Sequence, residues 1–220
     1  SLIPALVAIG LILVILAVSG GVFVYQRYSY SDEQADLNAY FGLSAPEEAA
    51  IVYGNEIVEE KGILQDGRCY LSLDTVHTYL NDRFYVDYNE KLLLYTLPDQ
   101  VVRIGLDERT EDGYVAAFER DGSAWLALDY VKRYSDFNFE LYTEPNRVVL
   151  ETSWDEIRVA ELKKDTDVRE KGGVKSPVLV AAAKGDRVTV LEELENWDRV
   201  QTRDGYIGYV EKKRLTEPEA

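Results

Sequence analysis

The chain has 220 residues, enough for one large domain or two to three small ones. Its formal net charge is −16 and Arg27 is its first charged residue, so the negative surface lies on residues 27–220 and excludes nucleic acid as a natural partner. Cys69 and His77 are the only cysteine and the only histidine, which excludes an internal disulfide framework and any site in this chain that needs two imidazoles.

The first element is an apolar run from Leu2 to Tyr25. Its 24 residues span about 36 Å as a helix, enough to cross a hydrocarbon core of about 30 Å. A cleavable signal peptide with its cleavage site near Ala17-Val18-Ser19 is the rival interpretation, but signal cores run only about 7 to 15 residues. We therefore expect residues 1–27 to be a membrane anchor, and the acidic remainder favours an extracytoplasmic C-terminus. The lipid contacts are expected at Leu2, Leu11, Leu16, Phe23 and Tyr25.

Residues 31–62 are predicted to form a short helix and a hairpin that lead into the rest of the chain. Ser31-Asp32-Glu33-Gln34 matches a capping box, which places the start of the helix at Ser31. Gly42 is expected to end it. Two short apolar runs around Gly54-Asn55 then predict the hairpin.

A repeat follows, in which residues 66–79 align with residues 121–134 without a gap at an offset of 55. The identical positions are turn residues, apolar residues and one aspartate in the first turn of each predicted helix, Asp74 and Asp129. A carboxylate there stabilises a helix N-terminus, so a structural role is favoured over a catalytic one. Each copy is predicted to be a strand, a helix and a hairpin. The shared positions are Asp66/Asp121, Gly67/Gly122, Leu71/Leu126, Leu73/Leu128, Asp74/Asp129, Val76/Val131 and Tyr79/Tyr134.

The repeated Y-L-x-L-D-x-V-x-x-Y unit with its hairpin resembles the stalk module named after the N-terminal domain of copper amine oxidases. The resemblance covers residues 63–153, with copies at about 63–98 and 118–153, and implies a duplicated stalk domain. Copper chemistry is excluded because the catalytic domain of those oxidases needs three histidines. We expect neither a metal nor a cofactor.

Residues 155–217 contain several short strands separated by glycine turns, a pattern typical of a small barrel. The segments K-G-D-R-V-T-V-L (184–191) and N-W-D-R-V-Q-T-R-D-G-Y-I-G-Y-V (196–210) resemble the bacterial SH3 (SH3b) family in order and spacing. The resemblance implies a ligand-binding barrel, although the loop 170–177 is longer than the family's usual turn. Trp197, Tyr206 and Tyr209 are the candidate ligand-binding residues, and core packing is the alternative for each, favoured for Trp197.

No residue is predicted to be catalytic. Adjacent glutamates such as Glu192-Glu193 are typical of solvated faces rather than of a hydrolase pair. No serine or cysteine has a plausible base partner in the sequence.

The sequence therefore predicts an α+β protein: an N-terminal transmembrane helix, tandem stalk units and a C-terminal SH3-like barrel. The predicted function is that of a non-catalytic surface module in a bacterial plasma membrane, single-pass, whose stalk sets the distance between helix and barrel and which directs a partner toward cell-wall glycan or peptide. The alternative is the anchoring region of a family 18 glycoside hydrolase (chitinase-like), which the order of anchor, Ala39-Tyr40-Phe41-Gly42-Leu43, stalk and barrel resembles. A catalytic barrel would then lie beyond Ala220.

Overall fold

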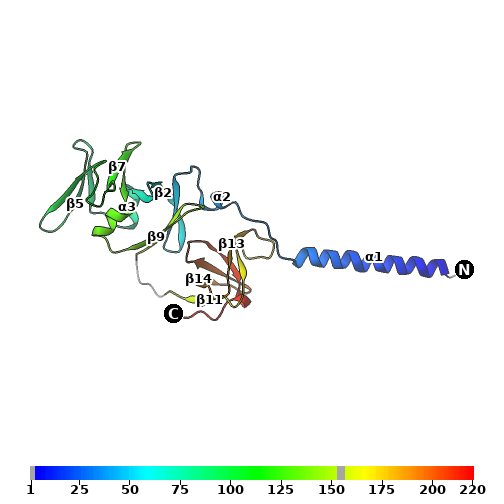
Figure 1. The fold of residues 1–220 in the computed structure, drawn as a ribbon. Helices are drawn as coiled ribbons and strands as arrows, with labels where there is room; N and C mark the ends of the chain where they lie inside the picture. Colours follow the sequence, from blue (N-terminus) through cyan, green and yellow to red (C-terminus); the bar gives the residue numbers. More distant parts are fainter. Residues whose placement is uncertain (1–2, 153–156) are drawn as a thin grey trace.

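The computed structural model describes residues 3–152 and 157–220, and Figure 1 traces their path. The chain begins with helix α1 (Ile3–Tyr28), which projects away from the other elements and has no buried residue. Its mean hydropathy is 2.8, so it is long and apolar enough to cross a membrane. Leu11, Leu16, Phe23 and Tyr25 are all largely exposed on it, while Leu2 lies outside the described residues.

The capping box predicted at Ser31 is wrong, because the helix starts five residues later. Helix α2 (Leu37–Phe41) has Asp36 as its N-cap, whose side chain accepts a hydrogen bond from the Ala39 amide at 3.1 Å. Residues before Asp36 are extended, since a strand of the barrel offers them backbone partners, and Gln34 forms a parallel bridge to Val178. The predicted stop at Gly42 is confirmed by its left-handed φ of 66°.

The middle of the chain forms a seven-stranded sheet in the order β7-β8-β3-β2-β1-β10-β9 and a smaller sheet in the order β4-β5-β6. The strands of the large sheet are β1 (Glu48–Tyr53), β2 (Glu56–Gln65), β3 (Arg68–Ser72), β7 (Ala117–Arg120), β8 (Ser123–Ala127), β9 (Asn138–Tyr142) and β10 (Arg147–Glu151). The small sheet consists of β4 (Phe84–Asp87), β5 (Leu92–Thr96) and β6 (Val101–Gly105), and the helices are α3 (Leu73–Tyr79), α4 (Leu128–Val131) and the 3-10 turn η1 (Lys132–Tyr134).

The first strands of the two repeat copies pair with each other within this sheet. Strands β3 and β8 are antiparallel, and Leu71 lies opposite Leu126, its equivalent in the other copy. The neighbouring pairs are Tyr70 with Ala127 and Ser72 with Trp125, and exchanging the two copies turns one of these pairs into the other. A local twofold axis therefore passes between Leu71 and Leu126 and relates the first strands of the copies, while their hairpins lie in different sheets.

One residue explains why the two repeat helices differ in length. Ser72 caps α3, and its hydroxyl accepts a hydrogen bond from the Thr75 amide at 3.2 Å. The equivalent Ala127 supplies no side-chain cap, and α4 changes after four residues into the turn η1. Loss of a cap at this position shortens the regular helix.

Strand β1 is buried on both faces of the large sheet. Ala49 and Ile51 belong to the core beneath α3 and α4, whereas Ala50 and Val52 belong to a second cluster on the opposite face. A parallel neighbour, β10, accounts for this near-continuous apolar strand. The large sheet therefore has a second apolar face that another domain must cover.

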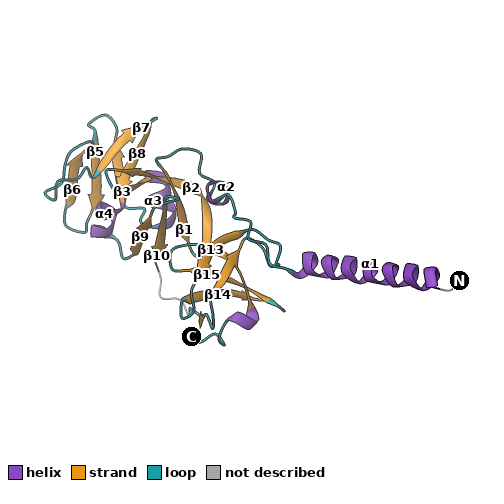
Figure 2. Cartoon of the chain, turned by 45° about the vertical axis from the view of Figure 1, so that its right-hand side comes forward, coloured by secondary structure: helices purple, strands orange, loops and turns teal. Residues whose placement is uncertain are grey.

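The second domain is a six-stranded barrel in the order β11-β14-β15-β16-β12-β13 (Figure 2). Its strands are β11 (Val159–Glu161), β12 (Thr166–Arg169), β13 (Val178–Ala182), β14 (Arg187–Glu193), β15 (Trp197–Thr202) and β16 (Ile207–Glu211), followed by the turn η2 (Lys212–Arg214). Its core contains Val168, Val188, Val200 and Val210. The seven-stranded, six-stranded and three-stranded sheets, together with the helices, confirm the α+β class.

The barrel, not the stalk, adjoins the exit of α1. The linker after the helix (residues 29–36) runs along β13, where the Ala35 amide donates to the Val178 carbonyl at 2.9 Å. In Figures 1 and 2 the tip with β5 lies at the end of the molecule opposite α1. The order expected from the sequence, with the stalk as a spacer between helix and barrel, therefore differs from the arrangement in space, because the linker folds back onto the barrel.

Candidate binding surfaces of the barrel

The outer face of β15 and β16 carries two of the three predicted aromatic residues. Trp197 lies opposite Glu211, and Arg199 lies opposite Tyr209. Cross-strand partners share a face, so these four side chains point away from the core that Val200 lines on the other face. Both aromatic rings are partly exposed. The face combines flat apolar surface with one cation and one carboxylate.

The loop 170–177 covers the strip between the two rings. A side chain at Gly172 would lie 3.3 Å from Cβ and Cγ of Trp197 and 3.6 Å from Cδ1 of Tyr209. The loop is closed by a hydrogen bond from the Lys171 amide to Oγ of Ser176 at 2.8 Å. Glycine lets the loop approach the Trp197 ring this closely, and the loop forms one wall of the aromatic face.

A pocket of about 300 Å³ lies beside Trp197 and is partly filled by the linker. Tyr30 reaches into it from the linker, and its hydroxyl donates to the Glu211 carboxylate, with oxygen distances of 2.8 and 3.0 Å. Burial alone would raise the pKa of Glu211, but hydrogen bonds from Tyr30, Lys213 and Arg214 hold that pKa below its usual value. Glu211 is therefore ionised at neutral pH.

Arg169 joins the linker, the loop and the barrel. Its side chain is only 2% exposed and forms an ion pair with Asp167 at 3.0 Å. Its Nη1 donates to the carbonyl of Ser31 at 2.8 Å and to the carbonyl of Ser176 at 2.7 Å. We call this set of contacts, with the backbone pairing of residues 31–35 to β13, the linker clamp.

Tyr206, the third predicted residue, lies in the contact between the two domains instead. It is 4% exposed, its ring centroid is 5.4 Å from that of Phe41, and the Arg147 guanidinium lies 4.6 Å from its centroid. Arg147 also pairs with Asp204 at 3.1 Å. The Tyr206 side chain is thus packed between α2 and the stalk sheet, where a ligand on the barrel surface does not reach it.

A second tyrosine fixes the same contact. The Tyr40 hydroxyl donates to the carbonyl of Ile207 at 2.5 Å and accepts from the Ile207 amide at 2.9 Å. Burial raises the pKa of Tyr40 to about 12. The hydroxyl therefore stays protonated and bridges the end of β16 throughout the physiological pH range.

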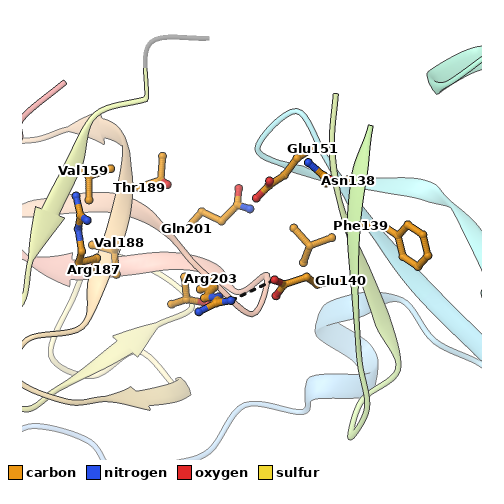
Figure 3. Close-up of a pocket in the computed structure, with 12 residues that line it drawn as sticks. Asn138, Phe139, Glu140, Glu151, Val159, Arg187, Val188, Thr189, Gln201 and Arg203 are labelled. Carbon is orange, nitrogen blue, oxygen red and sulfur yellow. Dashed lines mark hydrogen bonds and ion pairs between the residues drawn. The ribbon is translucent and has the colours of Figure 1, made fainter. Parts of the chain in front are cut away.

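A cleft that was not predicted from the sequence opens between the stalk sheet and the barrel (Figure 3). It consists of two adjoining parts of about 590 and 770 Å³, which share the lining residues Glu140, Arg187, Val188, Thr202 and Arg203. The lining comes from β9 and β10 on one side and from β14 and β15 on the other. No motif marks it, because its residues come from strands that lie far apart in the chain.

Cys69 is the cysteine that could act as a nucleophile, and it lies in the core of the stalk sheets. Burial raises the pKa of the Cys69 thiol to about 12, so it is a neutral core residue at neutral pH. Within residues 3–152 and 157–220, no three His, Cys, Asp or Glu side chains gather as ligands for a metal ion.

Comparison with known proteins identifies one part of the chain. No curated protein matches it. Among solved structures, NlpC1 from Trichomonas vaginalis is similar at 17% identity and a TM-score of 0.26, over 61% of this chain and 40% of that protein, so the chain spans less than half of its length. Residues 164–216 match the bacterial SH3 domain family. The C-terminal barrel is therefore a bacterial SH3 domain, as the sequence resemblance predicted.

Proposed function

We propose that this chain is a single-pass, membrane-anchored module of a bacterial cell surface whose SH3 domain holds cell-wall peptide or glycan close to the membrane. The observation that carries the proposal is the bacterial SH3 domain at 164–216, clamped directly to the end of an apolar helix long enough to span a bilayer. The SH3 domain suggests wall binding, and the helix and the acidic surface favour an extracytoplasmic position.

The aromatic face of the barrel is the proposed contact surface. Trp197 and Tyr209 offer rigid amphipathic area of the kind that stacks on sugars and on peptide planes. Arg199, which lies opposite Tyr209, supplies a guanidinium for hydrogen bonds, while the Glu211 carboxylate is already bonded to Tyr30, Lys213 and Arg214.

The stalk unit holds a partner farther from the membrane than the SH3 domain. Its small sheet, with the exposed Tyr85 and Tyr88, lies at the end of the molecule opposite α1. In this role the stalk still directs a binding or catalytic partner, and that partner lies farther from the membrane than the wall contact of the SH3 domain.

The test is sedimentation of the full chain, in detergent, with purified bacterial wall sacculi. We expect the protein to co-sediment, and Trp197→Ala and Tyr209→Ala to weaken binding by about tenfold each, the effect of losing one aromatic contact. Tyr85→Ala, which removes an exposed tyrosine from the stalk, is the matched control. Failure to bind walls of several compositions would refute the proposal.

The side of the membrane is tested separately by protease treatment of intact cells. Residues 31–220 are expected to be cut from the outside. Protection of these residues in intact cells, with cleavage only after lysis, would place the domains in the cytoplasm.

The anchoring region of a family 18 glycoside hydrolase stays a prediction from the sequence, as does the likeness of the stalk to the copper amine oxidase module. Under that alternative these residues anchor and position an enzyme whose chemistry lies elsewhere. The reading frame beyond Ala220 decides it: a family 18 catalytic motif there would support the alternative, and a stop codon would remove it.

A further inference from the structure

We propose that the cleft between the stalk sheet and the SH3 domain is a second binding site, for a short peptide that carries both free carboxylates and a free amine. This proposal rests on the proposed function only for the source of such a peptide, because the stem peptides of cell walls carry free carboxylates and a free amine. The cleft differs from the aromatic face, because none of Trp197, Arg199, Tyr209 and Glu211 lines it.

The first argument is the buried amide of Gln201. This residue lies on β15 opposite Thr189 of β14, and Figure 3 shows its side chain directed into the gap between the two domains. Its Oε1 atom is shielded from solvent and has no hydrogen-bond partner. A buried acceptor without a donor is unfavourable, and most native structures pair such groups. A peptide N–H in the cleft would satisfy it.

The second argument is the distribution of charge across the cleft. In the part of about 590 Å³, the SH3 domain contributes the guanidinium groups of Arg187 and Arg203, and the stalk sheet contributes the carboxylates of Glu140 and Glu151. Asp186 and Asp204 of the SH3 domain line only the adjoining part, where Asp204 is paired with Arg147. Guanidinium groups bind carboxylates through paired hydrogen bonds, and carboxylates bind an ammonium group. Opposite walls of opposite charge therefore favour a ligand that carries both charges over a purely anionic or cationic one.

The contact that now crosses the cleft is weak enough for a ligand to replace. Arg203 and Glu140 are 3.2 Å apart, but their side chains are 84% and 53% exposed. Exposed ion pairs contribute little to stability, because water competes for both groups. Hydrogen bonds from Tyr142 and then from Arg203 lower the pKa of Glu140, so this carboxylate is in its charged form at neutral pH.

The remaining surface fits small side chains. Val149 of β10 and Val159 of β11 line the part of about 590 Å³ and leave a limited apolar area between the charged walls. An alanine-sized group is the natural occupant. The predicted ligand is thus an extended peptide with a small apolar residue, at least one free carboxylate and one free amine.

The experiment is a calorimetric titration of the full chain in detergent micelles with the stem tripeptide L-alanyl-γ-D-glutamyl-meso-diaminopimelate. We expect saturable binding at one site per chain. Gln201→Glu, which keeps the size of the side chain but places a negative charge against the ligand's carboxylates, and Arg187→Ala should each raise Kd by about tenfold. Amidation of the tripeptide's carboxylates should weaken binding in the same way.

Matched controls keep the result specific to the cleft. Gln100→Glu and Arg103→Ala make the same changes at exposed positions of the stalk tip and should leave Kd unchanged. The far-ultraviolet circular dichroism and melting temperature of each variant establish that it is folded.

The outcomes separate this proposal from the proposed function. Equal tripeptide binding by the wild type and the folded cleft variants would overturn the proposal, as would absence of tripeptide binding by a chain that still sediments with wall sacculi. In both cases wall binding through the aromatic face stands. Tripeptide binding that the cleft variants abolish, in a chain that does not sediment with sacculi, would support the site and refute the wall-binding role.

Discussion

Replacing Arg169 with alanine removes the centre of the linker clamp. The guanidinium loses its bonds to the carbonyls of Ser31 and Ser176, at 2.8 and 2.7 Å, and its ion pair with Asp167. Each hydrogen bond to a charged group contributes about 1.5 to 3 kcal/mol. The Asp167 carboxylate is 40% exposed and returns to water, so loss of the ion pair adds little to the cost.

The expected cost is therefore about 3 kcal/mol, because the freed Ser31 carbonyl also regains water. This is a large share of the roughly 5 to 15 kcal/mol that stabilises a small domain. The cost should appear as release of the linker from β13. At about 1.4 kcal/mol for each factor of ten, opening of the clamp becomes about a hundredfold more frequent.

Hydrogen exchange at three backbone amides measures this opening. The Ser31 amide donates to Val174, the Ala35 amide to Val178, and the Val178 amide to Glu33. In Arg169→Ala all three should exchange about a hundredfold faster, whereas Arg203→Ala, which removes an arginine that is 84% exposed, should leave them unchanged. Unchanged exchange of these amides in folded Arg169→Ala would refute the linker clamp.

Three further predictions concern single positions. Gly208→Ala should destabilise the barrel by about 2 kcal/mol or more in denaturant unfolding, because its Cβ would lie 2.5 Å from the Arg169 carbonyl oxygen, and a loss below about 0.5 kcal/mol would contradict the packing. Burial raises the pKa of Asp198, so this carboxyl stabilises the fold below its ordinary pKa, and that contribution is lost as pH rises through its folded pKa. Asp198→Asn should therefore raise the melting temperature relative to wild type by more at pH 7 than at pH 4. An equal effect at both pH values would contradict the raised pKa. The Cys69 thiol should resist iodoacetamide at pH 8 in the folded chain and react in urea, and rapid labelling without urea would contradict its burial.

Local patterns in the sequence predicted what depends on neighbouring residues. The apolar run, the Gly54-Asn55 hairpin, the Asp-Gly turns and the stop at Gly42 each follow from the conformational preferences of a few adjacent residues. The barrel strands were also predicted, because glycine turns separate them.

Features that depend on distant partners were missed. Ser31 matches a capping box, but its amide donates to Val174 in the loop 170–177 and its carbonyl accepts from Arg169, and these bonds outweigh a weak helical preference. Tyr206 is of a residue type that often contacts ligands, yet it packs against Phe41, which precedes it by 165 residues. The cleft has no local signal at all, since Gln201 and Glu140 meet only after two domains pack.

The linker clamp also decides how the molecule would respond to pulling. If the membrane and a wall ligand on the SH3 domain move apart, tension enters at α1 and leaves through the barrel. The backbone bonds between residues 31–35 and β13 and the contacts of Arg169 connect these two points directly. The large sheet lies on a covalent loop outside this path, so it bears no load until the clamp opens, and only then does the stalk add its length between membrane and wall.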